Sequence, residues 1–212
     1  MVELNKNLLR ENILNKIITI GREFGSGGRE LGRKIAEKLG WEFYDKEIIA
    51  EIAKRTEFSE HYIHEVLENN PHELFPITVG HTFTFIDAYA LQKKQMVFTE
   101  QENAIKQMAE SSNCVIVGRC SDYILRDLNP VKVFVYSDMQ CKVNRCRERE
   151  KLEHLSDKQL IKTNKKIDKN RAKYYEFYSG RKWGDKLNYD LMVNTSNGNL
   201  DTIADSICKL LK

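Results

Sequence analysis

The chain has 212 residues, of which 41% are hydrophobic, and its 34 basic and 31 acidic side chains leave a formal net charge of only +3. This length fits one large domain, or one domain with a small lid or insertion. The small net charge does not by itself imply nucleic acid as a partner, and the chain has no apolar run near the ~18 residues of a membrane span. With a charged N-terminal segment and five scattered cysteines, it predicts a cytoplasmic protein without a structural zinc site or a disulfide framework.

Apolar runs and helical spacings alternate along the chain. The expected elements, in order, are a strand at 16–20, a helix at 30–39, a strand at 41–45, helices at 46–55, 59–69 and 98–111, a strand at 114–117, a helix at 121–127, a strand at 131–136, helices at 139–151 and 156–178, a strand at 189–193 and a helix at 199–211. Residues 71–95 show no clear pattern. Strands that alternate with helices predict an α/β fold with a parallel sheet covered on both faces.

The turn at 21–30, GREFGSGGRE, joins the first strand to the first helix. Glycines let backbone N–H groups close around an anion, and the N-terminus of the helix adds a favourable dipole. The lysine and hydroxyl of the G-x-x-x-x-G-K-[ST] loop are missing. Arg22 and Arg29 are the nearby cations that can replace the lysine, with Arg29 preferred because it lies beside the helix start, and Glu30 can hold a hydrated magnesium ion. The alternative is a tight turn without a ligand.

Arg119 directly follows the predicted strand at 114–117. Ligands of open α/β sheets bind at the carboxyl ends of the strands, and a guanidinium group placed there can hold a phosphate with two hydrogen bonds. A salt bridge to a carboxylate is the alternative use of this side chain.

The long polar helix near the C-terminus carries one inward-facing arginine. Ile167, Arg171, Tyr174 and Tyr178 recur at spacings of four, three and four, so they share one face, and Asp168 can orient Arg171. An inward arginine on a basic helix is typical of a lid that closes over phosphates. A solvated face with one ion pair is the alternative. Nucleic-acid binding is disfavoured because the aromatic side chains fit packing better than a stacking surface.

Together these segments resemble the cytidylate kinase-like family of P-loop nucleoside monophosphate kinases over almost the whole chain. The matching segments are ITIGREFGSGGRELGRKIAEKLGWEFYDKEII, CVIVGRCSDYIL, DKNRAKYYEFYSG and WGDKLNYDLMVNTS. The resemblance is closest to a branch in which REFGSGGRE replaces the usual kinase loop. Gly118 and Arg119 match the centre of the family's Asp-Gly-Arg-Asp motif, and Asp168 and Arg171 match the second half of its lid motif.

The resemblance implies a P-loop NTPase fold of the nucleoside monophosphate kinase type, a three-layer sandwich with a five-stranded parallel sheet and a helical lid. Residues 1–212 would form one domain, with 46–112 as a helical substrate-side region and 150–182 as the lid. The implied reaction is ATP-dependent phosphoryl transfer, assisted by Mg²⁺, to a nucleoside monophosphate (CMP-like) or another small phosphorylated acceptor. A small-molecule nucleotide is the expected partner, rather than a membrane or nucleic acid.

The resemblance also implies roles for individual residues. The donor nucleotide would be bound by Arg22, Gly25, Ser26, Gly27, Gly28, Arg29 and Glu30. The residues expected to act on the reacting phosphates are Arg29, Arg119, Arg171 and Asp168. Arg119 would hold the acceptor phosphate, and Arg171 would stabilise the transferring group when the lid closes.

Two other functions fit parts of the sequence. Without the loop lysine, the chain could bind a nucleotide or phosphoester with no kinase turnover. A short-chain NAD(P) oxidoreductase would explain the G-x-x-x-G-x-G spacing from Gly21, the position of Asp45 roughly 20 residues on, and Tyr178-x-x-x-Lys182. The oxidoreductase leaves the arginines of the loop and of the Gly118 turn unexplained.

Overall fold

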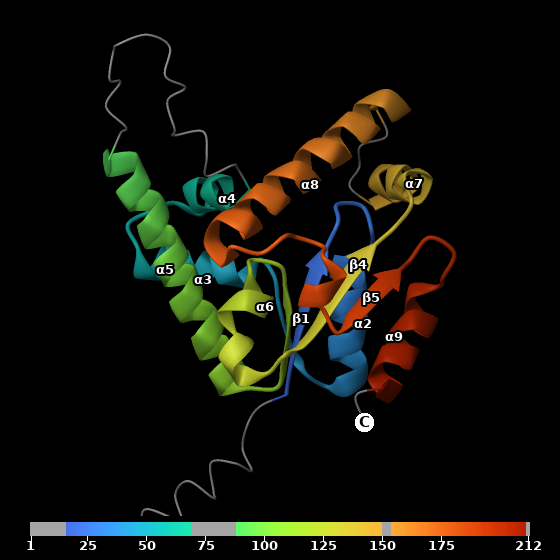
Figure 1. The fold of residues 1–212 in the computed structure, drawn as a ribbon, viewed down its shortest axis with the longest axis horizontal. Coiled ribbons are helices and arrows are strands. Elements are labelled where there is room, and N and C mark those ends of the chain that lie inside the picture. Colours follow the sequence, from blue (N-terminus) through green and yellow to red (C-terminus); the bar gives the residue numbers. More distant parts are fainter. Residues whose placement is uncertain (1–15, 69–87, 150–153, 211–212) are drawn as a thin grey trace, which may run out of the picture.

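A parallel sheet forms the centre of the protein (Figure 1). The computed structural model describes residues 16–68, 88–149 and 154–210. The strands are β1 (Ile17–Arg22), β2 (Glu42–Tyr44), β3 (Cys114–Val117), β4 (Val131–Tyr136) and β5 (Leu191–Asn194). They lie in the order β2-β3-β1-β4-β5, and every neighbouring pair is parallel. The predicted α/β class with a five-stranded parallel sheet is therefore confirmed.

Helices cover both faces of this sheet. They are α2 (Gly28–Leu39), α3 (Glu47–Arg55), α4 (Glu60–Glu68), α5 (Ala88–Ser111), α6 (Ser121–Ile124), α7 (Met139–Arg149), α8 (Asp157–Ser179) and α9 (Leu200–Leu210), with short 3-10 turns at Arg126–Leu128 and Lys186–Asn188. Side chains of α2 and α9 pack on one face. Side chains of α3, α4, α5, α6 and the C-terminal half of α8 pack on the other.

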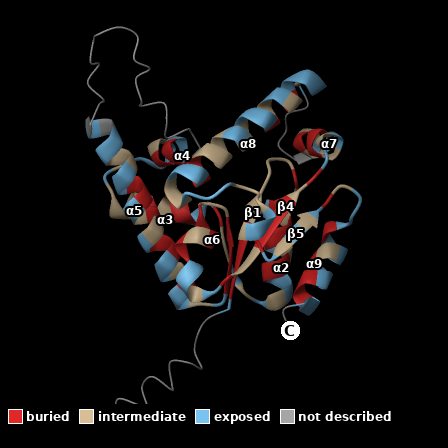
Figure 2. Ribbon diagram, viewed as in Figure 1, coloured by how far each residue is buried: buried red, intermediate tan, exposed pale blue. Residues whose placement is uncertain are grey.

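The apolar runs form strands that are buried on both faces, as Figure 2 shows for the centre of the sheet. Ile18 and Ile20 of β1 face α2 and α9, whereas Ile17 faces the opposite helices. In the register, Ile18 lies between Val115 of β3 and Val131 of β4. This burial fixes β1 firmly, so the loop that follows it starts from a rigid point.

The helix ends follow local signals, and the larger differences from the prediction are at the starts of α2 and α5 and at the end of α6, which stops at Ile124 rather than at residue 127. Helix α8 begins with a capping box between Ser156 and Gln159. Helix α2 starts at Gly28 rather than at residue 30, because Gly27 adopts the left-handed N-cap conformation. Helix α5 starts at Ala88 rather than at residue 98. The rest of the unassigned stretch, 71–87, lies outside the described residues, as do positions 69, 150, 151 and 211 of the expected helices.

Helix α8, in the region predicted as a lid, is anchored at its C-terminal half. Tyr174 and Tyr175 are buried in the core formed with α3, α4, α5 and α6, while its N-terminal half extends toward α7 (Figure 1). No helix within the described ranges has the length and apolar character needed to cross a membrane.

Candidate phosphate-binding site

Charged side chains gather at the carboxyl edge of the sheet. Arg22 ends β1, Asp45 directly follows β2, and Gly118 and Arg119 follow β3. The strands are parallel, so these positions meet at one edge, where ligands of open α/β sheets bind.

The loop between β1 and α2 curls back through two glycines. Gly25 and Gly27 have φ values of 72° and 80°, in the left-handed region that favours glycine. The first bond of α2 runs from the Leu31 amide to the Gly27 carbonyl (2.9 Å). The amides of the first turn precede that bond, and they supply donors and the positive end of the helix dipole to the space beside the loop.

A cleft of about 500 Å³ lies beside this loop. Its lining comes from the loop, the start of α2, Phe43 of β2, and the helices α7 and α8: Arg22, Glu23, Phe24, Gly25, Gly27, Gly28, Arg29, Glu30, Arg33, Phe43, Arg145, Cys146 and Arg171. The cleft therefore combines backbone donors with several guanidinium groups, which is the chemistry that binds a polyphosphate.

Ser26 holds the loop together from within. Its side chain is fully buried, its hydroxyl donates to the Glu23 carbonyl (2.8 Å), and it accepts from the Gly28 amide (3.4 Å). Its carbonyl accepts from the Thr195 hydroxyl (2.6 Å) and from Arg145 Nη1 (3.1 Å). Arg145, although it lines the cleft, is thus committed to the loop and to the end of β5.

A partly buried ion cluster of Glu23, Lys142 and Asp168 holds the start of the loop. Lys142 of α7, whose side chain is 5% exposed, places Nζ 2.6 Å from Glu23 and 3.2 Å from Asp168. Asp168 also accepts a hydrogen bond of 2.6 Å from the Phe24 amide. Burial raises the pKa of Asp168 above its ordinary value, against the lowering effects of the Phe24 amide, Lys142 and Arg171. Asp168 therefore ties α7, α8 and the loop together.

Arg22 packs closely against two glycines, Gly118 and Gly28. A Cβ at Gly118 would lie 1.7 Å from Arg22 Nη1, and a Cβ at Gly28 would lie 2.6 Å from Arg22 Cβ. The Arg22 side chain is 13% exposed, and its Nη2 lies 3.7 Å from Asp45. The carboxylate of Asp45 also pairs with Arg29, at 2.5 Å from Nε, while the Arg29 side chain is 57% exposed.

The turn after β3 has an unusual backbone. Gly118, Arg119 and Cys120 have φ values of 71°, 59° and 55°, so two residues that carry a Cβ adopt the left-handed conformation in succession. Gln101 of α5, fully buried, stabilises this turn by donating to the Arg119 carbonyl (3.0 Å), and it accepts from the Tyr174 hydroxyl (3.3 Å). Such strain persists where the surrounding structure holds it, and it clusters at functional sites.

The positive φ of Arg119 predicts that glycine destabilises this position less than alanine does, the reverse of the usual order. Arg119→Gly is expected to be at least as stable as Arg119→Ala, because alanine retains the left-handed cost of about 1 kcal/mol. Urea unfolding of both variants measures the difference. The matched control is Arg126, a nearby arginine without a positive φ, where glycine should be the less stable substitution. A glycine variant at 119 that is less stable than the alanine variant would contradict the assignment of strain.

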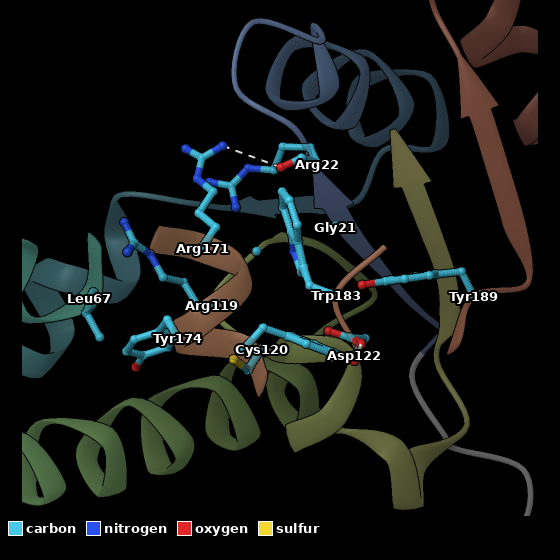
Figure 3. A pocket seen from close by; sticks show the side chains of 12 residues that line it. Gly21, Arg22, Leu67, Arg119, Cys120, Asp122, Arg171, Tyr174, Trp183 and Tyr189 are labelled. Carbon is cyan, nitrogen blue, oxygen red and sulfur yellow. Dashed lines mark hydrogen bonds between the residues drawn. The ribbon is translucent and has the colours of Figure 1, made fainter. Parts of the chain in front are cut away.

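A second, smaller cavity adjoins the first and is shown in Figure 3. It measures about 40 Å³ and is lined by Gly21, Arg22, Leu67, Gly118, Arg119, Cys120, Asp122, Arg171, Tyr174, Tyr175, Trp183 and Tyr189. The side chains of Arg22, Arg119 and Arg171 lie near one another at one side of it. Arg171 Nη1 donates to the Arg22 carbonyl (3.4 Å), and its guanidinium lies 5.7 Å from the centre of the Phe24 ring.

The structure brings most of the predicted residues together, on two sides of this edge. Arg22 and Arg171 line both cavities, and Arg119 lines the smaller one. The larger cleft is lined by Gly25, Gly27, Gly28, Arg29 and Glu30. Ser26 and Asp168 line neither cavity formed by the described residues, because the Ser26 hydroxyl bonds to the Glu23 carbonyl and the Asp168 carboxylate bonds to the Phe24 amide. Sequence patterns did not reveal Lys142, Gln101, Asp122 or Trp183.

The residues that suggested an oxidoreductase have other contacts. Asp45 pairs with Arg22 and Arg29. Tyr178 stacks on Phe98 with the ring centres 3.8 Å apart, and Lys182 is exposed. Tyr178, the tyrosine of the Tyr-x-x-x-Lys pattern, is therefore used in aromatic packing.

The cleft offers a carboxylate to a magnesium ion through Glu30, in the first turn of α2. Lys34 Nζ of the same helix lies 3.9 Å from this carboxylate. The described residues contain no group of three or more histidine, cysteine, aspartate or glutamate side chains that could hold a metal. A single carboxylate beside substrate phosphates is compatible with Mg²⁺, which keeps several waters and needs only one or two carboxylates.

Comparison with known proteins agrees with this geometry. The sequence profile described as the cytidylate kinase-like family matches residues 17–197. An uncharacterized protein from Eubacterium ventriosum ATCC 27560 has a similar crystal structure, with 30% sequence identity, a TM-score of 0.65, and coverage of 93% of this chain and 98% of that chain. No curated protein matches the sequence significantly.

More distant structures share the fold. Shikimate kinase from Bacteroides thetaiotaomicron has 17% identity and a TM-score of 0.52, with 92% of this chain and 98% of that chain covered. TT1252 from Thermus thermophilus has 14% identity and a TM-score of 0.51, with 94% and 98% covered. The family match and the fold support a nucleotide-binding, kinase-like role. Because this match spans all five strands, the loop at 21–30 and the turn at Gly118 and Arg119, the chain belongs to the cytidylate kinase-like family.

Proposed function

We propose that the protein transfers the γ-phosphoryl group of ATP to a nucleoside monophosphate, CMP-like, or to another small phosphorylated acceptor. The observation that carries this proposal is the pair of adjoining cavities that share Arg22 and Arg171. A kinase needs a donor site and an acceptor site with cationic groups where they meet, since phosphoryl transfer depends on positioning and charge neutralisation.

In this proposal the larger cleft binds the donor. The amides around Gly25, Gly27 and Gly28 and the start of α2 contact its phosphates, and Arg29 can leave Asp45 to join them because its side chain is largely exposed. Glu30 would hold a hydrated Mg²⁺, which would neutralise part of the charge on the donor phosphates.

The smaller cavity binds the acceptor phosphate in this proposal. Arg119, fixed by its strained turn, holds that phosphate so that one of its oxygens attacks the γ-phosphorus as the bond to ADP breaks. Arg171 reaches the boundary of the two cavities, and there it stabilises the charge on the transferring group. The proposal places this reaction in the cytoplasm, and the five cysteines are free thiols, as reducing conditions require.

The test is a transfer assay with purified protein, Mg-ATP and a panel of AMP, CMP, GMP and UMP, with the products separated by chromatography. We expect ADP and one nucleoside diphosphate to form in equal amounts. Arg119→Ala should abolish the diphosphate, whereas Arg126→Ala, which changes an exposed arginine outside both cavities, should leave it unchanged. No product with any of the four nucleotides would refute a nucleoside monophosphate as the acceptor.

A binding protein without turnover is the second candidate, favoured by the ion pair between Arg29 and Asp45. Arg29, the cation proposed to replace the loop lysine, is already paired with a carboxylate in the structure. The two candidates differ in one result: binding of Mg-ATP in calorimetry, without ADP formation in the presence of the full acceptor panel, supports the binding protein.

A further inference from the structure

One face of α8 is made of lysines. A helix turns by about 100° and rises by about 1.5 Å per residue, so side chains at spacings of four, three, one, three and four lie within an arc of about 100° and about 22 Å of helix. From Asp157 to Tyr175, this arc holds lysines alone. We call this set the outer lysine stripe: Lys158, Lys162, Lys165, Lys166, Lys169 and Lys173.

The outer lysine stripe faces away from the candidate phosphate-binding site. Arg171, which lines both cavities, lies on the opposite side of α8, and Leu160 and Tyr174 are buried on that inner side. Five of the six lysines are exposed, and Lys173 is half-buried. Helix α8 lies along the upper side of the molecule in Figure 1, and Figure 2 shows exposed residues along its length. The stripe is therefore a surface separate from the cleft.

The stripe lacks the carboxylates that accompany basic side chains on other helices. Those helices place opposite charges four residues apart: Glu30 with Lys34, Arg33 with Glu37, Glu51 with Arg55, and Glu102 with Lys106. On α8, Asp157 pairs with Arg147 and Asp168 with Lys142. Among the described residues, no carboxylate forms an ion pair with a lysine of the stripe.

The stripe is electrostatically unfavourable by itself. Its lysines form six pairs that are three or four residues apart, and like charges at these spacings destabilise a helix. Helix α8 has seven basic and three acidic residues, a net charge of +4, whereas the whole chain has +3. The excess positive charge of the protein is therefore concentrated on one helix. A polyanion bound along the stripe would neutralise this repulsion.

We propose that the outer lysine stripe of α8 binds the phosphate backbone of double-stranded DNA. The packed aromatic side chains argue against a single strand, which binds largely by stacking of its bases. A duplex needs no stacking surface, because its phosphates lie outside and Lys contacts them without reading sequence. This inference does not depend on the proposed phosphoryl transfer.

The shape of the stripe favours a DNA duplex over two other polyanions. A helix with its side chains is about 10–12 Å wide, close to the ~12 Å of the DNA major groove, and Lys165 and Lys166 at opposite edges of the arc can reach phosphates of both strands. The major groove of duplex RNA is too narrow for this contact. An anionic bilayer gains stable binding when apolar side chains insert beside the cations, and the arc has none before Glu176, which ends it.

The experiment measures fluorescence anisotropy of a labelled DNA duplex of about 20 base pairs, titrated with the full-length protein without ATP, from about 50 to 200 mM KCl. Two variants remove the same charge. The stripe variant carries Lys162→Gln, Lys166→Gln and Lys169→Gln, and it removes all six like-charge pairs. The scattered variant changes three exposed lysines outside α8: Lys16→Gln, Lys186→Gln and Lys209→Gln.

We expect wild type to bind with a dissociation constant between about 10⁻⁴ and 10⁻⁶ M near physiological salt, and with a slope of log affinity against log salt of about −5, as six phosphate contacts require. The slope should shrink by about 2.7 in the stripe variant and by less than about 1 in the scattered variant. Urea unfolding should show the stripe variant to be at least as stable as wild type. A second stripe variant should repeat the loss of slope: Lys158→Gln, Lys165→Gln and Lys173→Gln.

The same titration is run with duplex RNA and single-stranded DNA of that sequence, and vesicles of phosphatidylcholine and phosphatidylglycerol are tested by sedimentation. Tighter binding of wild type to any of these than to duplex DNA would overturn the proposal. So would no binding to duplex DNA at about 50 mM KCl, or an equal loss of slope in the stripe and scattered variants. The stripe variant should keep the wild-type affinity for Mg-ATP, because its substitutions lie opposite Arg171.

Discussion

Replacing Arg171 with alanine is expected to lower the turnover number for phosphoryl transfer by about 10³-fold or more, the effect of losing an arginine that neutralises the transferring group. Arg171 lines both cavities, and its Nη1 donates to the Arg22 carbonyl. Its guanidinium therefore lies where donor and acceptor phosphates would meet. The loss should appear mainly in kcat rather than in the KM for ATP, because the charge that Arg171 neutralises develops during transfer.

Two further variants make this measurement specific. Arg171→Lys should recover only part of the rate, since an ammonium group lacks the planar pair of donors that a phosphate accepts. Lys169→Ala, which removes an exposed cation from the same helix, should leave kcat within about twofold, as expected of a surface charge away from the site. Steady-state kinetics with the acceptor found in the panel would measure all three. A loss confined to KM would contradict a role in the reacting state.

The fold was predictable from the sequence because its signals are local. The strands β1, β3 and β4 are buried on both faces or nearly so, and such strands form continuous apolar runs. Gly40 and Ser156 mark the ends of α2 and α8 by capping. The start of α5 was missed for the opposite reason. Leu91 and Met96 in its first part are exposed, so the apolar spacing that indicates a helix is blurred there.

The candidate site was predictable only in part. Arg119 and Arg171 could be placed from sequence, because one follows a strand and the other shares a helix face with apolar residues. The supports of the site depend instead on contacts between distant segments. The Asp168 side chain meets the Phe24 amide across 144 positions, and Gln101 meets the Arg119 carbonyl from another helix. No spacing within one segment carries such information. Arg29 shows the same limit, since its pairing with Asp45 depends on how β2 lies beside the loop.

Lys142 is expected to be the most important charge for stability in the described structure. Lys142→Met should lower the free energy of unfolding by roughly 3 kcal/mol, the low end for breaking a buried ion pair, because Glu23 is 28% exposed and Asp168 is 17% exposed. The variant leaves two carboxylates close together without their shared cation. The Phe24 amide would then be held by a carboxylate whose protonation is favoured, and Mg-ATP affinity should fall as the loop loosens.

Chemical denaturation of three variants, each compared with wild type, tests this expectation. Lys34→Met removes an ion pair of similar length to Asp201, but Asp201 is 55% exposed, so that variant should lose no more than about 1 kcal/mol. Adding Glu23→Gln and Asp168→Asn to Lys142→Met removes the unpaired charges and should restore most of the loss, because the asparagine can still accept from the Phe24 amide. If Lys142→Met is no less stable than Lys34→Met, the cluster does not hold the loop. If the triple variant regains stability but not Mg-ATP affinity, the ion cluster itself is needed to place the phosphate-binding amides.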